Sequence, residues 1–185
     1  ALQRYGAASP PKLADYLGEV IKAGERARDL VAQMLAFSRG ETSEVTRLEP
    51  APLVEQMMKM LRPILPSSIG ITLDIAPDLP AVAANVVQLQ QVLLNLCINA
   101  RDATIGVGTI TIAARYEHFE RADCASCHKQ FSGSYIALSV ADDGQGITPA
   151  QRIRIFEPFY TTKVEQKGTG MGLATVHGIV HRHGG

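Results

Sequence analysis

The feature that most constrains this chain is an ordered set of four short segments within its C-terminal half. They are a helix-forming stretch with Asn95 and Asn99, then DDGQGI at 142–147, FEPFYTTK at 156–163 and GTGMGL at 168–173. The set combines side-chain amides, an aspartate followed by alternating glycines, an aromatic-rich segment and a second run of alternating glycines. Each segment alone is a weak signal, but in this order they predict a nucleotide-binding pocket.

The first segment lies in a helix that we predict over residues 85–104. Residues three or four apart on a helix share a face, and one face here is polar: Gln88, Gln91, Asn95, Asn99 and Asp102. The opposite face carries Leu and Ala. The polar face holds neither Lys nor Glu, which is unusual for a surface that only needs to be solvated. Carbonyl and carboxylate oxygens suit Mg²⁺ that is already bound to phosphates, so this face is a candidate metal site.

The second segment follows an apolar stretch that we predict to be a strand. Asp142 can accept a hydrogen bond from an exocyclic amine such as that of adenine, and Gly144 and Gly146 allow a base to approach the backbone. The competing interpretation is a simple hairpin turn, because Asp-Gly is a strong turn signal.

The fourth segment leads directly into a predicted helix at 173–183. Glycines before a helix expose backbone N–H groups to phosphates at the positive end of the helix. The segment is not a dinucleotide-binding fingerprint, because Leu173 stands where that pattern needs glycine, and the chain has no P-loop sequence. The spacing also differs from that of a protein-kinase glycine loop.

The third segment connects the two glycine runs. Phe156, Phe159 and Tyr160 can anchor a loop whose Thr161, Thr162 and Lys163 reach phosphates, and the glycines that follow would let it move as a lid. The alternative is that these aromatic residues belong to the core, and Phe156 fits that alternative best.

The rest of the chain predicts a mixture of helices and strands without regular alternation. Apolar residues at three- and four-residue spacing predict a long helix over 12–39 that packs against other helices, and a polar linker follows. We predict a further helix around Leu53–Leu61, strands at 69–75, 109–116 and 135–141, and a long connection at 116–134. The fold class is therefore α+β, a two-layer sandwich of one mixed sheet covered by helices on one face.

Composition excludes several classes of protein. Hydrophobic residues make up 46% of the 185 residues, which is typical of a globular protein. Eighteen basic residues balance eighteen acidic ones, so we expect no broad binding to nucleic acid or to membranes. Three cysteines do not form a disulfide framework. Together with the lack of a signal peptide or spanning segment, this predicts a cytoplasmic location, as part of this protein or of a longer one.

Residues 85–185 resemble the ATP-binding catalytic domain of bacterial sensor histidine kinases, in the superfamily of gyrase, Hsp90 and mismatch-repair ATPases. QVLLNLCINARDA resembles the asparagine box, DDGQGI and GTGMGL the two glycine boxes, and FEPFYTTK the phenylalanine box. RARDLVAQMLAFSRG resembles the second helix of the dimerisation and phosphoacceptor hairpin. The resemblance implies a Bergerat-type ATP-binding fold preceded by a long helix, with residues 1–40 as part of the hairpin and 41–185 as the catalytic domain.

The resemblance also implies roles for individual residues. Asn99, helped by Asn95, would bind Mg²⁺ and act in catalysis, and Asp142 would bind the adenine amine of ATP. The remaining nucleotide-binding residues would be Asp102, Gly144, Gly146, Ile147, Thr162, Lys163, Gly168, Thr169, Gly170, Met171, Gly172 and Leu173. Implied partners are a response regulator receiver domain and, in the full-length protein, a second kinase copy bound through the hairpin.

The chain departs from the family pattern at two places. Its five histidines begin at His118, so the acceptor histidine of the first hairpin helix is missing, and we expect this chain to be a fragment that cannot phosphorylate itself. The family sheet would also continue past Gly185, which predicts a truncated C-terminal end.

Two other functions remain open from the sequence. A gyrase-type ATPase switch would carry a Glu one helical turn before the magnesium asparagine, but Asn95 stands there, and an amide cannot accept a proton from water at neutral pH. A nucleotide-responsive binding module without kinase activity is the other alternative.

Cys124, Cys127 and His128 form a CxxCH pattern within the predicted connection. We interpret it as an inert hairpin, with a metal or redox site as the alternative and haem attachment disfavoured by the absence of an export signal. A zinc site would need a fourth ligand. His177 and His181 have the spacing of a metal-binding pair, but the sequence favours a solvated helix face for them.

Overall fold

The computed structural model describes residues 13, 15–21, 24, 44–163 and 168–185. The chain divides into two compact units, 1–42 and 43–185. In the first unit, residues 13, 15–21 and 24 are helical. Most of the long helix that we predict over 12–39 lies outside the described residues, as does the whole of the stretch 26–40 that resembles the second helix of the dimerisation hairpin.

The second unit contains five strands and four helices among its described residues. In chain order they are β1 (Thr46–Leu48), α2 (Pro50–Leu61), β2 (Ile69–Ile75), β3 (Val82–Ala84), α3 (Val86–Ala103), β4 (Gly108–Asp123), β5 (Gln130–Asp142), α4 (Pro149–Arg152) and α5 (Gly172–Arg182). Strands β2, β4 and β5 form one mixed sheet, with β2 parallel to β4 and β4 antiparallel to β5. Strands β1 and β3 pair antiparallel in a separate small sheet.

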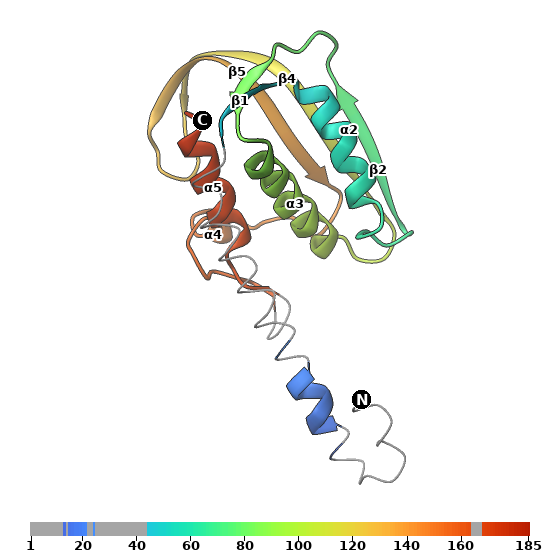
Figure 1. Ribbon diagram of the computed structural model, residues 1–185. Coiled ribbons are helices and arrows are strands. Elements are labelled where there is room, and N and C mark those ends of the chain that lie inside the picture. Colours follow the sequence, from blue (N-terminus) through green and yellow to red (C-terminus); the bar gives the residue numbers. More distant parts are fainter. Residues whose placement is uncertain (1–12, 14, 22–23, 25–43, 164–167) are drawn as a thin grey trace. The chain divides into compact units, whose positions relative to one another are not determined.

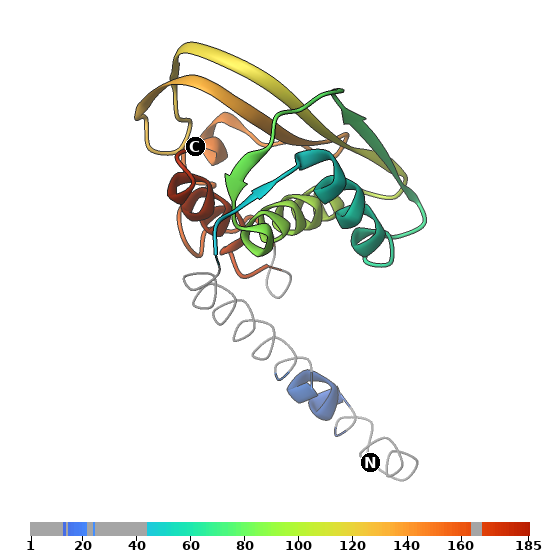
Figure 2. The ribbon, with the colours of Figure 1, turned by 45° about the horizontal axis from the view of Figure 1, so that its top comes forward.

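Helices α2, α3 and α5 lie on one face of the three-stranded sheet, so the unit has two layers (Figures 1 and 2). The α+β class and the one-sided cover of helices are therefore confirmed. The predicted strand 69–75 and helix 85–104 also appear within one residue of their expected bounds. The short elements β1, β3 and α4 were missed, because three or four residues are too few to show a hydrophobic period.

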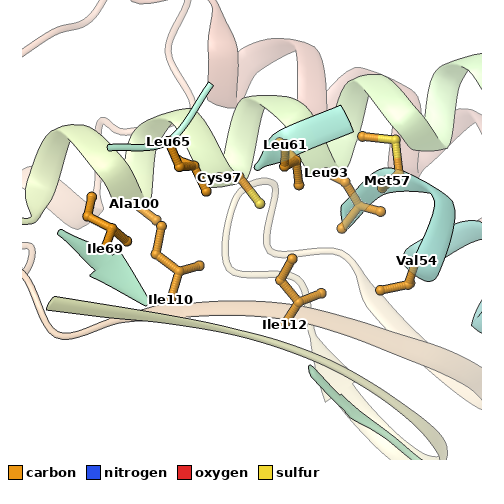
Figure 3. Packing of buried hydrophobic residues seen from close by; sticks show 10 residues of the cluster. All are labelled: Val54, Met57, Leu61, Leu65, Ile69, Leu93, Cys97, Ala100, Ile110 and Ile112. Carbon is orange, nitrogen blue, oxygen red and sulfur yellow. The ribbon is translucent and has the colours of Figure 1, made fainter. Parts of the chain in front are cut away.

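The main core lies between the sheet and helices α2 and α3 (Figure 3). Met57 and Leu61 of α2 and Leu93 and Cys97 of α3 face Ile110 and Ile112 of β4, all nearly inaccessible to solvent. Burial raises the pKa of the Cys97 thiol to about 11, so it stays protonated and behaves as a small apolar side chain. This packing fixes α3 against the sheet by its apolar face.

The prediction of a long connection at 116–134 is wrong. Strands β4 and β5 continue as a ribbon through most of that segment, with a register shift between Phe119 and Ala122, and only residues 124–129 connect them. Phe119 and Phe131 lie across the ribbon from each other, with ring centroids 5.4 Å apart. Such cross-strand aromatic pairs stabilise antiparallel strands beyond the cover of the helices.

We expect Ile110→Ala to lower the free energy of unfolding by about 2–5 kcal/mol, because it leaves a cavity between the sheet and two helices. The matched control is Ile105→Ala, since Ile105 is 82% exposed and should change stability by less than about 0.5 kcal/mol. Urea unfolding followed by circular dichroism measures both. Equal losses for the two variants would contradict the assignment of the core.

Candidate nucleotide-binding site

Helix α3 is the platform of the candidate site. It begins where the buried Asn85 side chain accepts a hydrogen bond from the backbone N–H of Gln88 at 3.0 Å. Its second contact surface packs on α5, where Val92 lies against Val176 and Ile179. With two faces held, the remaining face carries Asn95, Asn99 and Asp102, each half-buried.

The start of α5 lies against the two asparagines of α3. A Cβ atom at Gly172 would stand 3.6 Å from Asn99 Nδ2 and 3.9 Å from Asn95 Cβ. No side chain among the described residues caps this end of α5, so its first backbone N–H groups remain available to an anion. The structure therefore brings the second glycine box and the amide face of α3 to one place.

The first glycine box lies at the C-terminal end of α3. The backbone N–H of Gln145 donates to the Ala103 carbonyl at 3.1 Å. A Cβ atom at Gly144 would come within 2.5 Å of that same oxygen, so only glycine fits there. Asp142 follows from the end of β5, and its Oδ1 accepts from the Gly144 N–H at 3.0 Å.

Asp143 supports this turn, a role that the sequence did not reveal. Both of its carboxylate oxygens accept from the backbone N–H of Thr109, at 2.9 and 3.0 Å. Asp143 thereby ties the turn to the start of β4, while Asp142 accepts its hydrogen bond from within the turn itself, and both residues are exposed. In the sequence, only the Asp-Asp pair after a predicted strand could have indicated that one of the two aspartates supports the turn.

Lys163 joins the site through Asp102. Its Nζ lies 2.6 Å from Asp102 Oδ2, and Arg101 binds Asp102 Oδ1 at 2.7–2.8 Å. Burial opposes ionisation of Asp102, but the hydrogen bonds and charges of Lys163 and Arg101 outweigh it and lower the pKa of that carboxyl. The sequence did not single out Arg101.

Gly170 sets the path of the chain between Lys163 and α5. Its φ is +66° and a Cβ atom there would lie 2.3 Å from the Phe159 carbonyl carbon. The two residues are also joined by a hydrogen bond from the Phe159 N–H to the Gly170 carbonyl at 3.0 Å. This contact holds both ends of the predicted lid together, while residues 164–167 of that lid lie outside the described residues.

The other predicted residues lie around these contacts. Gly168 approaches Lys163 and Thr161, and the Thr169 hydroxyl accepts from the Met171 N–H at 3.3 Å. Exposed predicted residues are Ile147, Thr162 and the glycines Gly146 and Gly168, whereas Met171 and Leu173 are half-buried. Phe159 is 66% exposed, so the prediction that it anchors the loop is wrong for this residue.

The cysteine pair lies far along the chain from these residues but close to α5. Sγ atoms of Cys124 and Cys127 approach His181 Nε2, and His177 completes a cluster with them. Burial opposes ionisation of Cys124, but hydrogen bonds from Ser126 and Cys127 outweigh it and lower its pKa to about 6. Burial and the neighbouring His181 lower the pKa of His177. The prediction that the two histidines line a solvated face is therefore wrong.

Comparison with known proteins agrees with this arrangement. The family described as "Histidine kinase-, DNA gyrase B-, and HSP90-like ATPase" matches residues 84–185. The chain is 37% identical to Sensor kinase CckA of Brucella abortus over 180 residues, which is 96% of this chain and 19% of that protein. It is 34% identical to Two-component sensor PprA of Pseudomonas aeruginosa over 92% of this chain and 18% of PprA.

Among solved structures, full-length ShkA in complex with AMPPNP has a TM-score of 0.67 and 26% identity, covering 95% of this chain and 35% of ShkA. The chain thus belongs to the family of histidine kinase-, gyrase B- and HSP90-like ATPases, and its second unit is a histidine kinase-type ATP-binding catalytic domain. It spans about a fifth of the length of the curated relatives. No helix among the described residues is long and apolar enough to cross a membrane.

We expect Gly170→Ala to destabilise the domain by about 1–3 kcal/mol, because alanine disfavours positive φ and its Cβ would overlap the Phe159 backbone. Gly178→Ala is the matched control. Gly178 lies inside α5 with no atom within 4 Å of its Cβ position, so alanine there should stabilise by about 0.5–1 kcal/mol. Thermal unfolding that ranks the two variants the other way would contradict this account of the lid.

Proposed function

We propose that this chain binds ATP with Mg²⁺ and transfers the γ-phosphoryl group to a histidine outside the chain, as the catalytic module of a two-component sensor kinase. The observation that carries the proposal is that the second glycine box and Lys163 contact the polar face of α3, while the first glycine box contacts the C-terminal end of the same helix. The acceptor is external because no histidine precedes His118.

The residues of the α3 face fit a magnesium ion in their chemistry. Asn95, Asn99 and Asp102 present oxygen donors one helical turn apart on one half-buried face, and Mg²⁺ prefers oxygen ligands while keeping part of its water. Asn99 and Asn95 would hold the ion, which when bound would neutralise charge on the phosphate oxygens. Asp102 already pairs with Lys163 and Arg101, so it contributes by positioning these cations.

The remaining groups bind different parts of the nucleotide. Asp142 accepts a hydrogen bond from the adenine amino group, while Gly144 keeps the turn close to α3. The N–H groups at the start of α5 and the ammonium of Lys163 face the phosphates. In-line phosphoryl transfer depends mainly on such positioning and charge neutralisation, because the protein has little covalent chemistry to perform.

The partner and the location belong to the same proposal. A response regulator receiver domain is the expected final acceptor, since a relative that matches 92% of this chain is named a two-component sensor. The expected second kinase copy, bound through residues 1–40, and a cytoplasmic location follow from the same function. ATP hydrolysis as a gyrase-type switch is disfavoured because Asn95 offers an amide where a carboxylate base would be needed.

We expect Asp142→Ala to weaken ATP binding by about 1.5–3 kcal/mol, through loss of a charged hydrogen bond to adenine. Asp74→Ala is the matched control, because it removes an exposed carboxylate of β2 that pairs with Arg115 of β4. Calorimetry with ATP and GTP in the presence of Mg²⁺ measures the effect. If the unaltered chain binds ATP and GTP equally, the adenine role of Asp142 is wrong.

Asn99→Ala should abolish phosphoryl transfer to a separately supplied acceptor hairpin while weakening ATP binding less, because the metal acts mainly on transition-state charge. The matched control is Gln56→Ala, which removes an exposed amide from α2. Radiolabel transfer and calorimetry are measured on the same preparations. Transfer that survives Asn99→Ala would show that Asn99 does not hold the metal.

A further inference from the structure

We propose that Cys124, Cys127, His177 and His181 form a structural zinc site that joins the β4–β5 hairpin to α5. The four residues come from two segments about fifty residues apart in the sequence. The ligand atoms that they offer all lie within 4.8 Å of one another. Nothing in the candidate nucleotide-binding site uses any of the four.

The two segments are brought together by the curvature of the long ribbon. The hairpin end of β4 and β5 bends over α5, as both ribbon views show (Figures 1 and 2). The connection is a tight turn, closed by a hydrogen bond from the His128 N–H to the Cys124 carbonyl at 2.9 Å. This turn presents both cysteine sulfurs to the helix.

The distances match a tetrahedral site. Zinc bonds of about 2.3 Å to sulfur and about 2.0 Å to nitrogen, at tetrahedral angles, place sulfur and nitrogen about 3.5 Å apart. His181 Nε2 lies 3.6 Å from Cys124 Sγ and 3.5 Å from Cys127 Sγ. His181 Nε2 is within hydrogen-bonding distance of both sulfurs, and the three atoms are also spaced as ligands around one ion would be.

The two histidines are also placed to bind a metal ion. His177 and His181 are one helical turn apart, and their rings approach edge to face with centroids 4.3 Å apart. His177 Nε2 is buried and has no hydrogen-bond partner among the described residues. Such an atom costs free energy unless something binds it. The cluster consists of two imidazoles and two thiols, and the Asp and Glu side chains of the described residues are outside it.

The donor set selects zinc. Two sulfurs and two imidazole nitrogens in a closed, half-buried site are the ligands of structural zinc, and the spacing C-x2-C followed by H-x3-H is typical of it. Zinc binds both cysteines as thiolates, so two negative charges balance one Zn²⁺ and the site is neutral overall. His128 lies next to Cys127 but is outside the cluster, which separates this site from the haem-attachment pattern.

The metal would hold the C-terminal half of α5 to the β4–β5 hairpin, in addition to its contacts with α3. His183 already contacts Gln88 of α3 at 2.8 Å, and Val176 and Ile179 pack on Val92. The hairpin reaches beyond the cover of the other helices, so the zinc bonds would be its main attachment to the helical layer. We therefore assign the site a structural role in this domain.

The test uses the whole chain, purified under reducing conditions with Zn²⁺. We expect one zinc per chain by mass spectrometry of the metal. Metal-free protein reloaded with Co²⁺ should show the intense visible bands of tetrahedral cobalt and a thiolate-to-metal charge-transfer band in the near ultraviolet. Zn²⁺ should raise the thermal unfolding midpoint of the metal-free chain, because it binds the folded state.

Two matched pairs of variants test the ligand set. His181→Gln should weaken Zn²⁺ binding by at least about 100-fold, more than the loss usual for groups that only orient a ligand. His128→Gln changes the same residue type in the hairpin and should bind like the unaltered chain. Cys127→Ser should lose the charge-transfer band, whereas Ser126→Ala should keep it.

Three results would overturn the proposal. They are a reduced chain that takes up neither Zn²⁺ nor Co²⁺, a cobalt spectrum without thiolate bands, and zinc binding that needs His128 but not His181. A Cys124–Cys127 disulfide that forms in air while zinc fails to bind would replace the metal site with a redox pair. Circular dichroism of each metal-free variant shows whether it is folded, so that loss of a zinc ligand can be told from unfolding. The cobalt spectrum of the unaltered chain tests the site even if a variant fails to fold.

Discussion

The packing of α3 between the sheet and α5 is the interaction on which the rest of the domain depends. Leu93 and Cys97 bury one side of the helix against Ile110 and Ile112, while Val92 meets Val176 and Ile179 on another. Only the third side remains for polar groups. Because both apolar contacts fix the rotation of the helix, Asn95 and Asn99 lie beside the start of α5 and Asp102 meets Lys163. The candidate site therefore inherits its geometry from the core.

The site is then completed by backbone contacts that only small residues allow. Gly144 lets the turn after β5 approach the Ala103 carbonyl, and Gly170 lets the chain pass the Phe159 backbone. Electrostatics follow the same layout, since Lys163 and Arg101 meet at the half-buried Asp102 of α3. In the C-terminal half of α5, His177 and His181 face the cysteines of the hairpin. One helix thus links the two polar sites of the domain, about two turns apart along α5.

Much of the site could be predicted from the sequence because its parts are local. The amides at positions i and i+4 of α3 and the alternating glycines beside a helix can each be interpreted from fewer than ten consecutive residues. The pairing of Asp102 with Lys163, the support of the turn by Asp143 and the exposure of Phe159 could not be predicted. Each depends on where segments dozens of residues apart come to lie, which a local pattern does not encode.

Local sequence patterns were enough to predict the class of fold, the bounds of β2 and α3, and the set of glycine and amide positions, because hydrophobic period and backbone freedom are short-range properties. The tertiary structure alone decided how far the β4–β5 ribbon extends and what it meets. Aromatic pairs across the strands carry the ribbon past the helices, and its curvature brings Cys124 and Cys127 to His177 and His181. Each pair has a metal-binding spacing of its own, but the two pairs are about fifty residues apart, so only folding shows that they meet.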